Sequence, residues 1–288
     1  MSIVAIIGAG ALGGALAHSL AGRNRVDEVR LIDPEGRIAE GKALDILEAS
    51  SIEQFSTRIT AAATLAACAG ADVIVLADLA AGGEIAGEPG LALLRQIVRL
   101  ETSSPLLFAG GAQLDLMARA AGELHVPARR LIGSAPFALE SAVRAVTAAL
   151  LDASPADLAI CIAGVPPRDA VIAWSAATAF RQPIAAVLAA HQQAAITSRL
   201  PALWPPSPYA LASAAARIAE SLANASRRRY TCFASLDGKD RRGAIAAVPV
   251  QIAKGGIERT LDPALSPHER TVFENGLGTR VENRESPS

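Results

Sequence analysis

Hydrophobic and polar positions along the first 133 residues alternate between short apolar runs and longer mixed stretches. The apolar, often β-branched runs predict strands over 2–7, 28–32, 72–77, 105–109 and 130–132. The stretches between them predict helices over 11–21, 36–50, 91–100 and 114–122. In the helix over 36–50, Ile38, Leu44 and Leu47 fall roughly on one face. This alternation predicts an α/β protein with a doubly wound parallel sheet.

The rhythm changes after about Gly133. The pattern there predicts helices over 138–151, 183–200 and 209–222, strands over 158–163, 230–236 and 243–252, and a polar turn over 237–242. Four prolines between residues 201 and 208 prevent the second and third helices from joining. We therefore expect an N-terminal lobe over 1–134, a C-terminal α+β lobe over 135–276 and a polar, disordered tail over 277–288.

Composition and charge narrow the choice of partners. The formal net charge of the 288 residues is −1, which gives no general attraction to nucleic acid or to an anionic membrane. No apolar stretch approaches the ~20 residues that span a bilayer, and the apolar N-terminus lacks the basic leading segment of a signal peptide. The three cysteines are widely spaced, which favours reduced thiols in the cytoplasm. No spacing of His, Cys, Asp and Glu predicts a metal site.

A glycine motif stands where the first strand meets the first helix. In Gly8-Ala9-Gly10-Ala11-Leu12-Gly13, the first glycine permits a tight turn, the second lets a pyrophosphate approach the backbone, and the third lets helix and strand pack closely. Asp33 ends the second strand, where a carboxylate hydrogen-bonds a ribose 2′-hydroxyl and repels a 2′-phosphate. The motif predicts an NAD site, with NAD preferred over NADP. The residues expected at the cofactor are Gly8, Gly10, Ala11, Leu12, Gly13, Asp33 and Ala77.

Further motifs carry a family resemblance. Through Gly41-Lys42-Ala43-Leu44-Asp45-Ile46, and through Val248-Pro249-Val250 followed by Gly255-Gly256-Ile257-Glu258, the chain resembles the lactate/malate dehydrogenases, in particular the lactate-dehydrogenase-like malate dehydrogenases. The likeness extends to about Gly276. It implies an N-terminal Rossmann lobe, a C-terminal catalytic lobe, a homodimer or homotetramer, and hydride transfer between NAD and a small 2-hydroxy acid.

The family's reaction needs a histidine as proton acceptor, a carboxylate that orients it, an arginine that clamps the substrate carboxylate, and arginines on a lid. By alignment, the two lid arginines become Ala81 and Gly87, and no arginine lies between Arg58 and Arg95. Glu84 and Glu88 in the lid would instead repel an anionic substrate. The family's Asn-Pro-x-Asp becomes Ala112-Gln113-Leu114-Asp115.

The remaining catalytic positions are also replaced. The family's Leu-Asp-x-x-Arg places its Asp and Arg at Leu139 and Ala142, or in a register shifted by one residue at Glu140 and Val143. Its Gly-x-His-Gly-Asp becomes Gly164-Val165-Pro166-Pro167-Arg168, so that Pro166 stands at the histidine, and no histidine lies between His125 and His191. Arg144 and Arg168 are the basic groups expected near this region, more often solvated than bound to an anion.

The cofactor site carries one departure as well, because the family usually has glycine where Asp78 stands. A carboxylate there is expected to repel the pyrophosphate and lower the affinity for NAD. Three hypotheses follow. The first is an NAD(H)-binding pseudoenzyme that turns over little or no malate or lactate. The second is an NAD-dependent oxidoreductase with an altered substrate, and the third is an oligomeric scaffold without a ligand.

Overall fold

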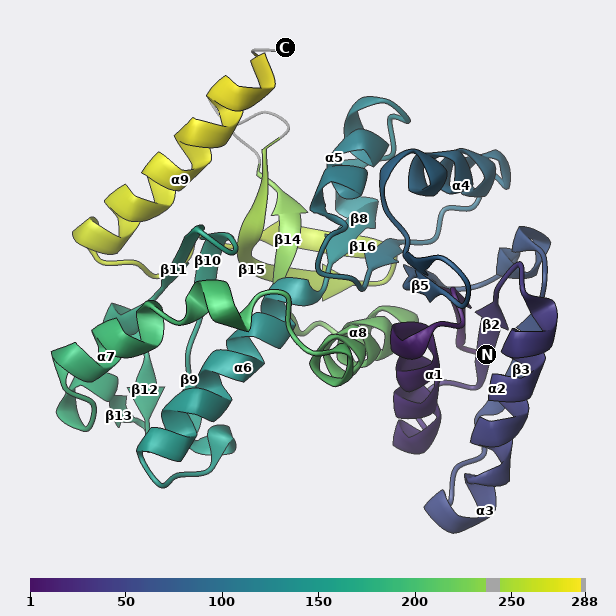
Figure 1. Cartoon of the computed structure of the whole chain (residues 1–288), viewed down its shortest axis with the longest axis horizontal. Coiled ribbons are helices and arrows are strands. Elements are labelled where there is room, and N and C mark those ends of the chain that lie inside the picture. The colour runs from purple at the N-terminus through teal and green to yellow at the C-terminus, as the bar shows by residue number, and fades with distance from the viewer. Residues whose placement is uncertain (237–243, 286–288) are drawn as a thin grey trace.

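The computed structural model describes residues 1–236 and 244–285 (Figure 1). Its N-terminal part is a parallel sheet in the order β3-β2-β1-β4-β7-β8. The strands are β1 (Ile3–Ile7), β2 (Glu28–Ile32), β3 (Arg58–Ala62), β4 (Val73–Leu76), β7 (Leu106–Phe108) and β8 (Leu131–Gly133). The helices between them are α1 (Ala11–Arg23), α2 (Gly36–Glu48), α3 (Ser50–Glu53), α4 (Gly87–Arg99) and α5 (Leu114–Gly122). The predicted doubly wound sheet is confirmed.

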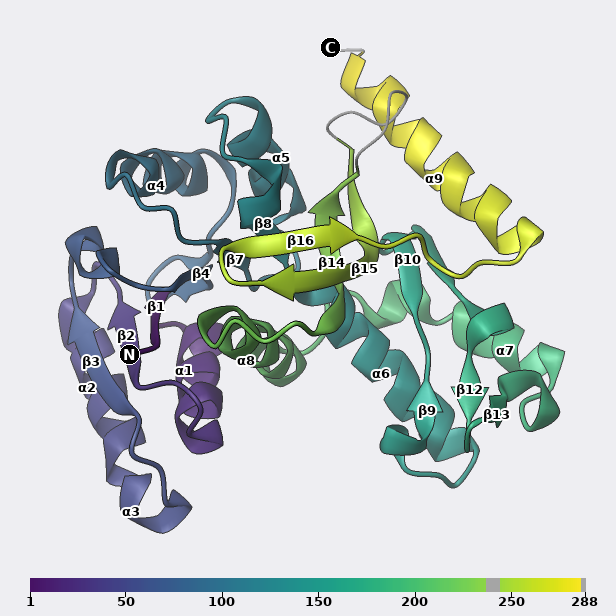
Figure 2. The ribbon, with the colours of Figure 1, turned by 180° about the vertical axis from the view of Figure 1, so that it is seen from behind.

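The C-terminal part continues the same sheet with antiparallel strands (Figure 2). Its strands are β10 (Ile162–Val165), β11 (Asp169–Ile172), β14 (Arg229–Ser235), β15 (Ile245–Ala253) and β16 (Gly256–Thr260). β14 joins β8 where Phe233 pairs with Gly133, so the described strands form one eleven-stranded sheet. A small separate sheet holds β9 (Leu158–Ala159), β12 (Thr178–Ala179) and β13 (Gln182–Pro183).

The helices of the C-terminal part are α6 (Ala135–Leu150), α7 (Ala190–Thr197), α8 (Pro208–Ala223) and α9 (Pro267–Glu285). Short 3₁₀ helices lie between these elements: η1 (Leu65–Cys68), η2 (Ala128–Arg130), η3 (Pro155–Asp157), η4 (Trp174–Ala176), η5 (Ile184–Ala186) and η6 (Leu200–Leu203). No helix among the described residues is both long and apolar to the degree that crossing a bilayer requires.

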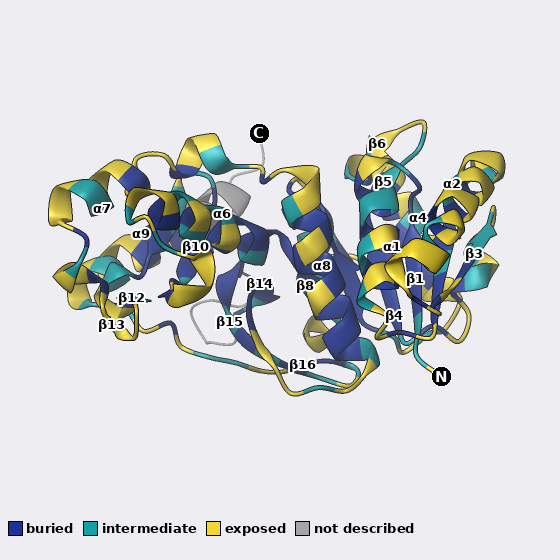
Figure 3. Cartoon of the chain, turned by 90° about the horizontal axis from the view of Figure 1, so that it is seen from below, coloured by how far each residue is buried: buried dark blue, intermediate teal, exposed yellow. Residues whose placement is uncertain are grey.

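Buried apolar side chains form two clusters. The larger runs through the parallel sheet and on through α8, β14 and β15 (Figure 3). The smaller gathers around α6, the small sheet and α7. Because the larger cluster takes residues from both sides of Gly133, burial alone does not divide the chain there. The boundary between the lobes at 134 and 135 therefore stays a prediction.

Three of the predicted elements differ from the structure, and the strands β3, β11 and β16 were not predicted. The strand over 158–163 is split into β9 and β10, and the helix over 183–200 begins only at Ala190, after β13 and η5. The tail expected to be disordered from Leu277 instead continues α9 to Glu285. Phe273 and Leu277 explain this helix, because both are buried in the larger cluster. The turn over 237–242 and the last three residues, 286–288, lie outside the described part of the chain.

The apolar face of α2 lies on the surface of the protein. Ile38, Leu44 and Leu47 are exposed, and Ile52 in α3 is 83% exposed. α2 packs inward with smaller residues, chiefly Ala39 and Ala43, together with Ile46. The pattern on this helix therefore marks a surface that has no partner within the monomer (Figure 3).

Candidate functional site

The glycine motif forms the turn between β1 and α1. Gly8 has φ +109°, a left-handed conformation that glycine adopts without strain. A Cβ on Gly13 would lie 1.9 Å from the carbonyl oxygen of Gly8, so only glycine allows the helix to approach the strand this closely. Ala11 and Leu12 form the first turn of α1, and Ala77 is fully buried just after β4. The structure thus brings the motif and the end of β4 together.

The carboxylate of Asp78 occupies the N-terminus of α1. Its Oδ1 accepts a hydrogen bond from the backbone N–H of Gly13 at 2.7 Å, and its Oδ2 accepts one from Leu12 at 3.1 Å. The N–H of Gly10 donates to the backbone oxygen of Asp78 at 2.8 Å. A Cβ on Gly10 would lie 2.3 Å from Oδ2 of Asp78. The space that glycine leaves open for a phosphate is filled by an anionic side chain of the protein itself.

Asp33 is enclosed at the end of β2. It is 1% exposed, and its Oδ2 accepts hydrogen bonds from the N–H groups of Ala9 and Ala80, at 2.7 and 2.9 Å. Its Oδ1 accepts one from the N–H of Glu35 at 2.9 Å. Both carboxylate oxygens are therefore engaged by backbone donors. The N–H of Ala80 thus occupies the same carboxylate oxygen as that of Ala9.

Asp78 and Ala80 belong to a short hairpin made of β5 (Asp78–Leu79) and β6 (Gly83–Glu84). Figure 1 shows β5 beside the start of α1. Asp78 pairs across the hairpin with Glu84, whose Oε1 accepts a hydrogen bond from the N–H of Ala112 at 2.6 Å. Burial raises the pKa of the Glu84 carboxyl, the Ala112 hydrogen bond opposes that shift, and the negative charge of Asp78 adds to it.

Gln113 fixes the base of this hairpin, a role that the sequence did not reveal. Its side chain is buried, and its Nε2 donates to the carbonyl oxygens of Ala77 and Ile85, at 3.2 and 3.1 Å. Its Oε1 accepts a hydrogen bond from the N–H of Gly110 at 2.9 Å. One amide therefore links three backbone segments around the cleft. These segments meet only in the folded chain, so no sequence motif predicts this contact.

The two lid positions carry no cationic group. Ala81 lies in the exposed turn of the hairpin, and Gly87 begins α4 with φ +60°. Glu88, expected to repel an anionic substrate, forms an ion pair with Arg119 of α5 at 2.6 Å. Glu84 points at Ala112, the position of the family's asparagine.

The face of α6 expected to carry the orienting carboxylate and the clamp is mostly apolar. Leu139 and Val143 are fully buried, and Ala142 is half-buried. Glu140 is buried as well, where its Oε2 accepts a hydrogen bond from Thr231 Oγ1 at 2.5 Å. Burial raises the pKa of Glu140, and Thr231 and Arg144 partly counter that shift. The Arg144 guanidinium lies 3.5 Å from Oε1 of Glu140, so this arginine is held by a carboxylate of its own helix.

Pro166, at the position of the family's histidine, is buried directly after β10. Proline has no titratable group and cannot accept a proton. Arg168, two residues further on, is exposed, as expected for a solvated arginine. The histidines lie elsewhere: His18 in α1, His125 before η2, His191 in α7 and His268 in α9. His18 is 3.1 Å from Glu53 of α3.

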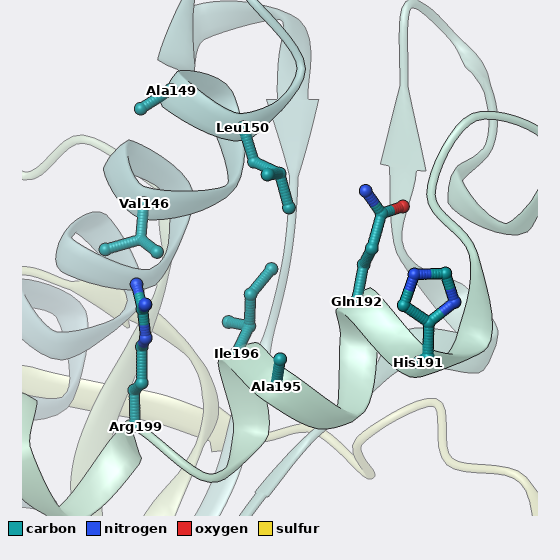
Figure 4. A pocket seen from close by; sticks show the side chains of 8 residues that line it. All are labelled: Val146, Ala149, Leu150, His191, Gln192, Ala195, Ile196 and Arg199. Atoms are coloured by element: carbon teal, nitrogen blue, oxygen red, sulfur yellow. The ribbon is translucent and has the colours of Figure 1, made fainter.

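A hollow of about 500 Å³ lies between α6 and α7 (Figure 4). Apolar side chains form most of its lining, with Leu150 and Ile196 facing one another from the two helices. His191 and Arg199 stand at its rim, and Pro166 is not part of its lining. This hollow is therefore separate from the segment after β10 where the alignment places the family's histidine.

Comparison with known proteins agrees with this geometry. The family model of the lactate/malate dehydrogenase NAD-binding domain matches residues 2–96. A malate dehydrogenase of Methylobacterium radiotolerans is 27% identical over 96% of this chain and 93% of its own length. The malate dehydrogenase structure of Salinibacter ruber superposes with a TM-score of 0.82 at 25% identity, covering 98% of this chain and 96% of its own.

A lactate dehydrogenase of Cryptosporidium parvum, solved with lactic acid and nicotinamide adenine dinucleotide, superposes with a TM-score of 0.85 at 20% identity over 100% of this chain and 99% of its own. The fold and the glycine cradle define a protein of the NAD-binding α/β class. Residues 2–96 match the model of the lactate/malate dehydrogenase NAD-binding domain, and the whole chain is similar in sequence and fold to malate and lactate dehydrogenases.

Proposed function

We propose that this chain is a non-catalytic, NAD(H)-binding member of the lactate/malate dehydrogenase family. The observation that carries the proposal is the buried Pro166 at the position aligned with the family's histidine, together with the apolar, buried Leu139 and Val143 of α6 at positions aligned with its aspartate and arginine. The only carboxylate on that face, Glu140, is held by Thr231 and Arg144. The backbone cradle for a dinucleotide is meanwhile complete in Gly8, Gly10 and Gly13.

The expected loss of activity follows from the chemistry that these positions perform. Removing a general base costs about 10²–10⁴-fold in rate. An arginine clamp holds a carboxylate through two parallel hydrogen bonds, which neither valine nor alanine can make. Since the base, the clamp and the lid arginines are all replaced, the losses combine, and turnover of malate or lactate should be negligible.

Two measurements test this proposal. Titration with NADH, followed by its fluorescence, should show saturable binding. Steady-state assays with malate and with lactate, from pH 6 to pH 10, should show no NAD reduction above background. Reduction of NAD by malate at about ten turnovers per second or more, an ordinary enzymatic rate, would refute a non-catalytic role.

The preference for NAD over NADP is part of the proposal. Asp33 supports it, because a buried carboxylate at the end of β2 repels a 2′-phosphate and accepts a 2′-hydroxyl. NADH is therefore expected to bind at least tenfold more tightly than NADPH. Equal dissociation constants for the two cofactors would contradict this role for Asp33.

A homo-oligomer is also proposed, and the exposed apolar face of α2 and α3 supports it. Leu44 is 57% exposed and Ile52 is 83% exposed, and Ile38 and Leu47 are exposed as well. Several large apolar side chains exposed on neighbouring helices are typical of a protein interface. Light scattering should give at least a dimer, and Leu44→Glu with Ile52→Glu should give a monomer. A monomeric wild-type protein would exclude this assembly.

The cytoplasm remains the proposed location. All three cysteines are free, and Cys68 and Cys232 are buried. Burial raises the pKa of Cys68 to about 11, which keeps it as an unreactive thiol at neutral pH. Free buried thiols suit a reducing compartment, and localisation of a tagged protein in its host tests this.

A ligand-free scaffold is the second candidate, and the position of Asp78 favours it. The carboxylate holds the N–H groups of Leu12 and Gly13 that a pyrophosphate would need. The scaffold hypothesis predicts that NADH does not bind, whether or not Asp78 is present. A variant without this carboxylate therefore separates the two candidates.

A further inference from the structure

We propose that the β5–β6 hairpin is a built-in plug of the dinucleotide cleft: its Asp78 carboxylate competes with NAD(H) for the backbone donors of α1, and its Glu84 carboxylate holds the hairpin in place at Ala112. This inference rests on the proposed binding of NAD(H). It adds a competing element within the chain itself, so that binding requires the hairpin to leave.

The first contact of the plug is at the phosphate cradle. Both oxygens of Asp78 accept hydrogen bonds from the first turn of α1, where the helix dipole and free N–H groups favour an anion. The virtual Cβ of Gly10 lies 2.3 Å from Oδ2, so the carboxylate uses the very space that the missing side chain provides. A pyrophosphate and this carboxylate cannot occupy that space together.

The second contact repeats the arrangement on the other side of the hairpin. Glu84 Oε1 accepts a hydrogen bond from the N–H of Ala112, and a Cβ on Gly110 would lie 2.0 Å from that oxygen. Gly110 and Gly10 therefore each leave room for one carboxylate of the hairpin. Since Asp78 and Glu84 are register partners, one small element fills both places at once.

The third contact covers the ribose position. The N–H of Ala80 donates to Asp33 Oδ2 at 2.9 Å and leaves Asp33 only 1% exposed. The base of the hairpin is fixed separately, since the side-chain amide of Gln113 holds Ala77 and Ile85. Residues 78–84 can therefore leave the cleft while the base remains in place.

The test compares NADH binding among four proteins by fluorescence titration into the millimolar range. They are the wild type, Asp78→Gly, the double variant Asp78→Gly with Glu84→Gln, and the control Glu40→Gln. Glu40 is an exposed carboxylate on α2 of the same lobe, so the control removes one negative charge without touching the hairpin. Asp78→Asn serves as a second variant if Asp78→Gly does not fold, as judged by circular dichroism.

We expect Asp78→Gly to bind NADH at least tenfold more tightly than the wild type and the control, and the double variant to bind at least as tightly. Hydrogen exchange gives an independent readout. In the wild type, saturating NADH should speed exchange at the Ala80 amide, because Ala80 leaves Asp33, while the Leu12 and Gly13 amides stay protected.

Two results overturn the plug, and they are distinguishable. One dissociation constant shared by all four proteins would show that the hairpin does not compete, while leaving NAD(H) binding intact. No binding by any variant, the double variant included, would remove the proposed NAD(H) function itself and the plug with it.

Discussion

The dinucleotide cleft and the region around Pro166 lie in one chain and depart from their family in opposite ways. In the cleft, the backbone is complete, with Gly8 at φ +109° and Gly13 packed against Gly8, and an added carboxylate fills it. Around Pro166, the backbone elements β10 and α6 are present, but the positions to which we align the family's histidine, aspartate and arginine carry proline and mostly apolar side chains. In our proposal the first region is intact but blocked, and the second keeps its backbone without its reactive side chains.

The difference follows from what each site is made of. A phosphate cradle consists of backbone N–H groups, so it persists as long as the turn and the helix persist. Acid–base catalysis needs particular side chains, and their exchange leaves the fold unchanged. We therefore expect a single substitution to unblock the cleft, whereas several would be needed to supply the side chains of the family's reaction.

The largest expected effect is a loss of stability when the glycine turn between β1 and α1 is altered. Gly13→Ala places a Cβ within 1.9 Å of the Gly8 carbonyl oxygen and should lower the free energy of unfolding by about 3 kcal/mol or more. Gly41→Ala is the matched control in a helix, since its Cβ meets nothing within 4 Å, and it should raise stability by about 0.5–1 kcal/mol. Urea denaturation measures both. Similar effects from the two substitutions would mean that the close approach of α1 is not required.

A second effect concerns the buried carboxylate of the emptied region. Burial raises the pKa of Glu140 above its ordinary 4.5, so its contribution to stability is complete below pH 4.5 and is lost as the pH rises through the raised value. The free energy of unfolding should therefore fall over that range, by up to about 1.4 kcal/mol per pH unit. The groups facing Glu140 are Thr231, the cationic Arg144 and the thiols of Cys161 and Cys232, whose own pKa values burial also raises.

Glu140→Gln keeps the hydrogen bond with Thr231 and removes the titration. Urea denaturation from pH 4 to pH 8 should show a smaller dependence on pH in this variant than in the wild type. Identical profiles would assign the pH dependence to other groups.

A third, smaller effect separates the two roles of Asp78. Without a ligand, its carboxylate caps α1, and losing a side-chain cap costs about 0.5–2 kcal/mol. Asp78→Gly should therefore be about 1 kcal/mol less stable than the wild type in buffer and should recover that loss in saturating NADH. Thermal unfolding with and without NADH checks this. A variant as stable as the wild type without NADH would show that the cap is unimportant.

The smallest expected effect is on malate turnover when a histidine replaces Pro166. Pro166→His supplies an imidazole at the family position but no clamp, because Val143 and Ala142 cannot bind a carboxylate and Ala81 and Gly87 remain in the lid. Turnover of malate should stay below detection in a steady-state assay. Measurable turnover in this single variant would show that the substrate is held by groups other than the family arginines.

Much of the cleft could be predicted from sequence because its signals are local. The glycine spacing and the apolar runs of β1 and β2 specify a turn and two strands, and the structure places them as expected. The sequence also indicated that Asp78 is unfavourable to a pyrophosphate. Gly82-Gly83 signals a turn, but the sequence could not show that Asp78 and Glu84 pair across it, since the register of a hairpin with two-residue strands depends on its contacts in the folded chain.

The elements whose positions were predicted wrongly are those in which tertiary contacts override the local sequence pattern. The helix expected from Pro183 starts only at Ala190, because the chain first pairs Gln182–Pro183 with β12 in the small sheet. The tail from Leu277 is helical since Phe273 and Leu277 anchor it to the core. The apolar face of α2 was visible in the sequence, but its exposure was not, because Ala39 and Ala43 bring the other face inward.

The pairing of β8 with β14 has a mechanical consequence. Phe233 sits against Gly133, the one residue pair that joins the two strands, where an added Cβ would lie 2.8 Å from the Phe233 Cβ, and the larger apolar cluster continues across this junction. Two halves that share one sheet resist a hinge motion relative to one another. Adjustment to an incoming molecule is then confined to short surface loops, and the rest of the body serves as a stiff frame against which they move.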